Sequence, residues 1–241
     1  MSREGDETLA FLVRAAREYL RGGTIFSGFH WPVLAGQTAA RLAPDAFVQL
    51  FEAGAVACGP ADSLPTSTTD YAALGSSLAW IGDTAGTLPP LVRRASRVVL
   101  DAANVDLAGR INSTAVGPYR QPSVRLPGGG GSADAAFAAR ELVLLHGGND
   151  PSRIVARVEH VTAAPAPGAT VRLLTRWGTI RLDGGPRFEE LAGVLPDHFT
   201  KLGVDASGAP EADPPSAPER AAAASVLSEA AVAGYVVARG F

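Results

Sequence analysis

Apolar residues recur at helical spacing in three stretches of the chain. The first lies between Asp6, which can cap a helix, and the Gly22–Gly23 pair, which can end one. Its apolar positions fall three or four residues apart and so share one face, at Leu9, Leu12, Val13, Ala16 and Leu20. The other two helices are predicted over residues 30–44 and 218–240, each with a proline that suits the first helical turn and the last with Gly240 near its end.

Short apolar runs lie between the helices and predict buried strands. These runs occupy residues 24–28, 46–51, 97–105, 141–146 and 153–162, and a hairpin is predicted around Trp177–Gly178. Because strands alternate with helices through the first two thirds, the expected fold class is α/β. We expect a mostly parallel open sheet flanked by helices, with a late β-hairpin and a C-terminal helix. Residues 1–241 are expected to form a single domain, with a Pro- and Ala-rich linker at about 204–219 before the last helix.

Composition and charge exclude several classes of function. The net charge is -3, and the basic residues form no patch interleaved with aromatics, so a nucleic-acid partner is not expected. One cysteine, Cys58, excludes an internal disulfide, and the four histidines lack metal-ligand spacing. No apolar run is long enough to span a membrane, and the N-terminal segment does not resemble a signal peptide. A cytoplasmic protein with no membrane association and no metal is therefore expected.

Glu52 is the first candidate for chemistry. It follows the apolar run 46–51, at the carboxyl end of a predicted strand, where open parallel sheets bind ligands. The small residues after it, including Gly54, would let a bulky substrate approach. A half-buried carboxylate there can act as a nucleophile toward an acyl group. It can also be an ordinary loop glutamate, and the stretch taken alone favours this second interpretation.

Two further segments could present polar groups to a ligand. Residues 104–117, which include Asn112 and Ser113, form either an ordered turn or a set of hydrogen-bond donors. Four glycines, Gly128–Gly131, precede a predicted helix and can offer backbone N–H groups to an oxygen atom, or can be a flexible connection. The segment matches neither the dinucleotide fingerprint nor the Walker loop. For Cys58 a buried apolar position is favoured, and His30 either lines the same pocket or simply packs.

Taken in order, four motifs resemble the B (β) subunit of family I coenzyme A transferases, most nearly the glutaconate CoA-transferase type. "LAPDAFVQLFEAG" (42–54) is similar to the family segment that carries the catalytic glutamate. "NVDLAGRINSTAVG" (104–117) and "RLPGGGGSADAA" (125–136) resemble its Asn-Ser-Thr loop and the glycine-rich loop over the thioester end of coenzyme A. "LLTRWGTIRLD" (173–183) resembles its late hairpin. The resemblance extends from about residue 22 to 183.

The resemblance implies a role for each motif. Glu52 would be the nucleophile that attacks an acyl-CoA and later carries coenzyme A as a glutamyl thioester. The implied substrate- and CoA-binding residues are Gly54, Asn112, Ser113, Gly128, Gly129, Gly130 and Gly131. Coenzyme A would be a co-substrate, with no bound cofactor. The partner would be a CoA-transferase α subunit, in an α2β2 assembly. The substrates would be an acyl-CoA and a carboxylic acid, with dicarboxylates such as glutaconate among the candidates.

Some positions depart from the family pattern and leave alternatives. Ala53 stands where Ser or Asn is frequent, Asn104 where Gln is, and Arg110 where Asn is. These departures affect the choice of substrate more than the class of reaction. Relatives with the same fold include CoA-thioester hydrolases and a decarboxylase, which lack the nucleophilic glutamate, so Glu52 favours a transferase. A non-catalytic partner subunit, with Glu52 in a structural role, is the remaining alternative.

Overall fold

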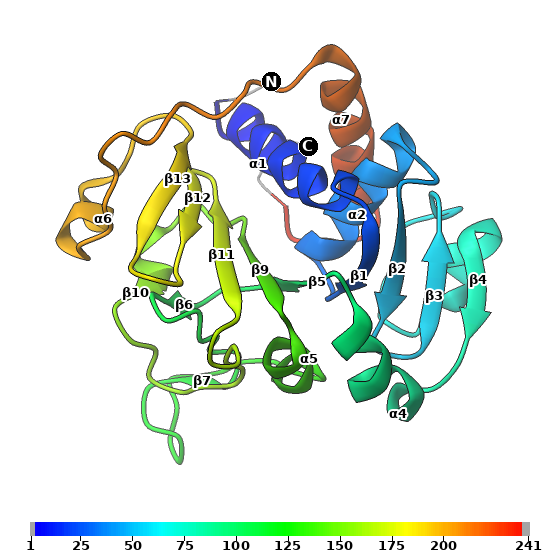
Figure 1. Ribbon diagram of the computed structural model, residues 1–241, viewed down its shortest axis with the longest axis horizontal. Coiled ribbons are helices and arrows are strands. Elements are labelled where there is room, and N and C mark those ends of the chain that lie inside the picture. The colour runs from blue at the N-terminus through cyan, green and yellow to red at the C-terminus, as the bar shows by residue number, and fades with distance from the viewer. Residues whose placement is uncertain (1–2, 238–241) are drawn as a thin grey trace.

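A nine-stranded mixed sheet organises the computed structural model, which describes residues 3–237 (Figure 1). The strand order is β13-β12-β11-β9-β5-β1-β2-β3-β4. The sheet strands are β1 (Gly23–Ser27), β2 (Phe47–Phe51), β3 (Ala55–Cys58), β4 (Leu78–Ile81), β5 (Arg97–Asp101), β9 (Glu141–His146), β11 (Thr170–Thr175), β12 (Gly178–Arg181) and β13 (Arg187–Leu191). Two small ladders lie outside it, β6 (Val105–Asp106) with β10 (Ile154–Val155), and β7 (Ala115–Val116) with β8 (Val124–Arg125).

The sheet is parallel in its centre and antiparallel at both edges. Strands β2, β1, β5, β9 and β11 run parallel, as their continuous apolar sequences predict. Strands β12 and β13 add an antiparallel hairpin at one edge, and β3 and β4 add another at the opposite edge. The predicted α/β class is confirmed, with a parallel centre flanked by helices. The edge strands β3, β4 and β13, which the sequence did not indicate, pair antiparallel and make the whole sheet mixed.

Helices cover the two faces of the sheet unequally. On one face lie α1 (Arg3–Leu20), α2 (Trp31–Leu42) and α7 (Ala217–Val232), seen together at the top of Figure 1. Fully buried Phe11, Leu34 and Val226 from these helices belong to one core with sheet residues such as Val143. The short α3 (Tyr71–Leu74) packs into this same core through Leu74, whereas the opposite face carries α5 (Ser132–Ala138), α4 (Thr84–Gly86), α6 (Asp197–Lys201) and irregular segments. Each face therefore has its own apolar core.

Three local predictions are corrected. The strand predicted over 153–162 is wrong, since only β10 forms there and it pairs with β6 outside the main sheet. The last helix ends at Val232, and Gly240, predicted near its end, lies outside the described residues. Cys58 is exposed at the end of β3 rather than buried.

The segment predicted as a linker, about 204–219, is held against the sheet. The N–H of Phe188 donates to the carbonyl of Asp205 at 2.7 Å, and the N–H of Ala212 donates to the carbonyl of Leu191 at 2.7 Å. Its last residues already belong to α7, which begins with a capping box made by Ser216 and Glu219. These contacts dock the chain along β13 before the final helix.

The five parallel strands end at one edge of the sheet, which is where open α/β sheets bind ligands. Glu52 follows β2, and Asp101 and His146 end β5 and β9 at the same edge. Within residues 3–237, no helix combines the length and apolar character needed to cross a lipid bilayer. In the same residues, His, Cys, Asp and Glu side chains form no group that could hold a metal ion.

Candidate active site

A tight turn between β2 and β3 presents Glu52. The N–H of Gly54 donates to the carbonyl of Phe51 at 3.0 Å, and Gly54 adopts φ +104°, a conformation that favours glycine. The phenol of Tyr71 donates to the carbonyl of Ala53 at 2.6 Å and fixes the turn from outside. These contacts hold the backbone on both sides of Glu52, so the side chain projects from a restrained base.

The Glu52 side chain lies against the glycine segment. A Cβ added to Gly130 would lie 3.0 Å from both carboxylate oxygens of Glu52, and one added to Gly131 would lie 3.1 Å from its carboxyl carbon. Glu52 is half-buried and, among the described residues, its carboxylate makes no hydrogen bond or ion pair. The sheet thus brings residues 52 and 130 together and leaves the carboxylate available to a ligand.

The glycine segment is anchored at its ends and open in its middle. The N–H of Gly128 donates to the carbonyl of Ser113 at 2.8 Å, and the N–H of Ser132 donates to the carbonyl of Gly129 at 2.9 Å. Between these anchors, the amides of Gly129, Gly130 and Gly131 donate to no acceptor within residues 3–237. Unpaired backbone N–H groups beside a carboxylate are suited to binding an oxyanion or a carbonyl oxygen.

The Asn-Ser-Thr loop supports the glycine segment. Asn112 is buried, and its side-chain amide hydrogen-bonds to the backbone of Thr114 and Ala115. Both polar atoms of the side chain are therefore engaged within the loop. The backbone N–H of Ser113 donates to Oγ1 of Thr162 at 2.8 Å, while its carbonyl holds Gly128. Asn112 therefore shapes the loop, and Ser113 connects it to the glycines.

A pocket of about 510 Å³ joins these elements. Its base is apolar, formed by Phe26, Leu100 and Ile111, and Thr66–Thr68 form part of its rim. Of the residues predicted for the site, Glu52, Ser113, Gly128, Gly129 and Gly130 line it, and His30 does as well. Gly54, Asn112 and Gly131 lie beside the pocket. A Cβ on Gly54 would lie within 2.5–2.7 Å of the backbone of Gly82 and Asp83, so this glycine permits close packing of the turn.

Two contacts that position the site have no signal in the sequence. Thr162 bonds the Asn-Ser-Thr loop across 49 residues, and Tyr71 bonds the Glu52 turn across 18 residues. Thr162 falls in the segment predicted as a strand, where its hydroxyl gave no reason to single it out. Tyr71 lies in a four-residue helix, α3, too short to be recognised by periodicity.

Comparison with known proteins finds relatives among CoA-transferase subunits. No family model matches the chain. The B subunit of 3-oxoadipate CoA-transferase from Pseudomonas knackmussii is 33% identical over 139 residues, covering 55% of this chain and 51% of that protein. The B subunit of glutaconate CoA-transferase from Acidaminococcus fermentans is 25% identical over 173 residues, covering 67% and 62%. In sequence the chain is similar to the B subunits of these two CoA-transferases.

Solved structures share the fold of this chain. Glutaconate CoA-transferase from A. fermentans superposes with a TM-score of 0.72 at 19% identity, covering 93% of this chain and 92% of that one. A variant of the decarboxylase AibA/AibB superposes with a TM-score of 0.74 at 25% identity, covering 90% and 93%. The sequence alignments, by contrast, span only about half to three fifths of the curated relatives.

Proposed function

We propose that this chain is the B-type component of an enzyme that moves coenzyme A from an acyl-CoA thioester to a carboxylic acid. The observation that carries the proposal is the half-buried Glu52 carboxylate, which has no partner in residues 3–237 and lies against Gly130 and Gly131. A carboxylate nucleophile must stay ionised, reachable and free of a competing cation. We also propose that residues 1–241 act as one domain.

The reaction proceeds by two exchanges at the Glu52 carboxyl group. A carboxylate oxygen of Glu52 attacks the thioester carbonyl, and the tetrahedral oxyanion collapses to a mixed anhydride while coenzyme A leaves as a thiolate. The thiolate then attacks the Glu52 side of the anhydride, which releases the first acid as its carboxylate and leaves a glutamyl-CoA thioester. An incoming carboxylate reverses both steps and departs as the new acyl-CoA. No net proton is consumed.

The glycine segment supplies electrostatic help to these steps. The free amides of Gly129, Gly130 and Gly131 are oriented donors for a developing oxyanion, and such donors typically contribute about 10²–10³ in rate each. The apolar base of the pocket excludes water from the anhydride and the thioester, which limits hydrolysis. An A-type subunit completes the site in this proposal, as the names of both curated relatives indicate a second subunit.

A decarboxylase is the second candidate, because the AibA/AibB structure is among the most similar neighbours. The two candidates differ in what leaves the substrate. A transferase moves label from acyl-CoA into the thioester of an added free acid, whereas a decarboxylase releases carbon dioxide and keeps the thioester intact. A hydrolase would produce only free coenzyme A and acid. Glu52 as an available nucleophile supports the transferase.

The test is chemical trapping in the complex of this chain with its A-type partner. After incubation with acyl-CoA, borohydride should reduce a thioester at Glu52 to the alcohol, and peptide mass spectrometry should locate the change there. Glu52→Gln should lose the adduct and slow transfer by about 10⁴-fold or more. Its thermal stability should stay close to wild type, since the carboxylate makes no internal bond. Transfer at wild-type rate in this variant would refute the proposal.

A further inference from the structure

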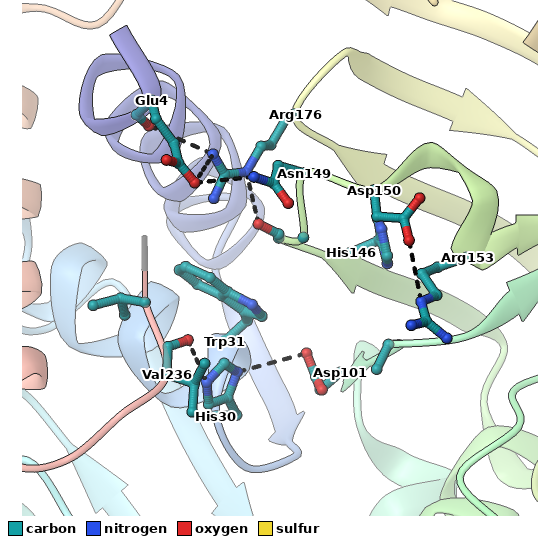
Figure 2. A pocket seen from close by; sticks show the side chains of 14 residues that line it. Glu4, His30, Trp31, Asp101, His146, Asn149, Asp150, Arg153, Arg176 and Val236 are labelled. Carbon is teal, nitrogen blue, oxygen red and sulfur yellow. Dashed lines mark hydrogen bonds and ion pairs between the residues drawn. The ribbon is translucent and has the colours of Figure 1, made fainter. Parts of the chain in front are cut away.

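A second pocket, of about 660 Å³, shares two lining residues with the first. Figure 2 shows the side chains that line it. His30 and Asp101 line both pockets, so these two side chains lie where the pockets meet. The second pocket also contains Trp31, His146 and Arg153. A substrate chain that leaves the Glu52 site between His30 and Asp101 would enter this space.

His146 lines the second pocket and has a buried ring nitrogen without a hydrogen bond. His146 is only 3% exposed, and its Nδ1 lies 2.9 Å from the carbonyl oxygen of Ala102. Since a carbonyl oxygen only accepts, Nδ1 carries the proton of that bond. Burial lowers the pKa of His146, so the ring is neutral near pH 7 and Nε2 holds a lone pair. No donor among the described residues reaches Nε2.

His30 adds a second nitrogen without a hydrogen bond. Its Nε2 lies 3.0 Å from the carbonyl oxygen of Val236, and its Nδ1 is buried and lies 3.8 Å from Asp101, beyond hydrogen-bond distance. His30 also adopts φ +69°, a left-handed conformation that is strained for a residue with a side chain. The strained backbone places the ring between the two pockets.

The cations of the second pocket are already engaged. Arg176 donates to the carbonyl of Gly147 at 2.7 Å and lies 3.9 Å from Glu4, and Arg153 lies 3.3 Å from Asp150. The lining of the pocket therefore carries three carboxylates and two guanidinium groups, since Asp101 adds to the two paired carboxylates. The pocket is thus rich in acceptors, and a carboxylate at the far end of a substrate would meet repulsion from this excess of negative charge.

We propose that the second pocket receives the far end of a hydroxylated acyl chain, whose hydroxyl donates to Nε2 of His146. The proposal rests on the proposed function and narrows its substrate class, from acyl-CoA thioesters in general to those with a distal hydroxyl. It places dicarboxylic substrates, which were among the candidates from sequence, below hydroxy acids in preference. His146 is in this scheme a specificity-determining residue that takes no part in the exchange at Glu52.

The experiment compares three series of thioesters with the complex of both subunits. Each series covers chain lengths from butyryl to octanoyl. The acyl chain ends in a methyl group in the first series, in a hydroxyl group in the second and in a carboxylate in the third. At the length that fits best, kcat/KM for the hydroxylated thioester should exceed that of the unsubstituted one by about 10-fold or more. The dicarboxylic thioester should be the poorest of the three.

Two variants test His146 by different routes. His146→Phe removes the acceptor, and Gly148→Ala keeps the imidazole but puts a methyl carbon 3.3 Å from its Cε1 and Nε2. Both should bring the hydroxyl-to-methyl ratio of kcat/KM close to one. Gly86→Ala is the matched control, because its added Cβ also meets one side chain at 3.2 Å but lies outside both pockets, and it should keep the ratio.

Direct binding separates this proposal from the proposed function. On addition of the free hydroxy acid, the ¹⁵N resonance of His146 Nε2 should move upfield, as an imidazole acceptor does on hydrogen bonding. That shift without any transfer would support the pocket and count against the transferase. Transfer with no hydroxyl preference, or with a preference that survives both variants, would overturn the pocket assignment while leaving Glu52 chemistry intact.

Discussion

Gly130→Ala tests the contact between the glycine segment and Glu52. Gly130 has φ +50°, where an alanine costs about 1 kcal/mol of unfolding free energy. The added Cβ would lie 3.0 Å from both carboxylate oxygens, about 0.4 Å inside ordinary van der Waals contact at 3.4 Å, so the carboxylate must move. A 1 Å displacement of a reacting group costs about 10²-fold in rate, and 0.4 Å on the same logarithmic scale costs about 6-fold.

The assay measures both quantities on the same preparations. Initial rates of CoA transfer in the two-subunit complex give kcat, and urea unfolding of this chain gives the free energy of unfolding. Gly203→Ala is the matched control, since Gly203 has φ +75° and a Cβ there would meet nothing within 4 Å. It should lose about the same 1 kcal/mol without slowing transfer. If both variants transfer equally fast, Glu52 does not rest against the glycine segment during turnover.

Two further changes test the supports of the site and of the fold. Tyr71→Phe removes the 2.6 Å hydrogen bond to the carbonyl of Ala53 and should lower the urea unfolding free energy by about 1 kcal/mol, with slower transfer from the looser turn. Hydrogen bonding to Arg17 lowers the pKa of Glu219 from 4.5 to about 2. The folded state therefore binds this proton more weakly than the unfolded chain does. The free energy of unfolding should fall as the pH drops from 4.5 toward 2. Glu219→Gln keeps an acceptor for the Ser216 cap and should flatten that limb of the stability profile; an unchanged slope would contradict the assignment.

The central strands were predictable because each contains a short run of mostly apolar residues, most of which are buried. The edge strands were not, and β3 shows why. Its sequence, Ala55–Cys58, contains a single residue with high β-propensity, Val56. The other three residues are small and do not by themselves indicate a strand. It forms a strand because the Glu52 turn folds it back onto β2. Cys58 at its end is exposed for the same reason, since the strand leaves the core there.

The predicted strand over 153–162 failed through a different cause. Its alternating apolar residues do enter the core, with Ile154 fully buried and Val158 nearly so. The backbone between them bonds a side chain instead of a neighbouring strand, because the N–H of Val158 donates to the carboxylate of Asp106 at 3.1 Å. An alternating pattern predicts which side chains are buried, but it does not predict what the backbone bonds to. Here the carboxylate of Asp106 takes the place of a neighbouring strand.

The position of Glu52 at a strand end was readable from the sequence, but its lack of a partner was not. Arginines pair with other glutamates, as in Arg41 with Glu229 at 2.6 Å and Arg172 with Glu18 at 2.6 Å, and among the described residues none pairs with Glu52. A guanidinium beside Glu52 would have stabilised the carboxylate and lowered its nucleophilicity. The fold instead places Gly130 and Gly131 against the carboxylate, and their amides donate to no acceptor among the described residues. In the proposed reaction a bound thioester carbonyl completes both groups, because the carboxylate attacks its carbon while the amides donate to its oxygen.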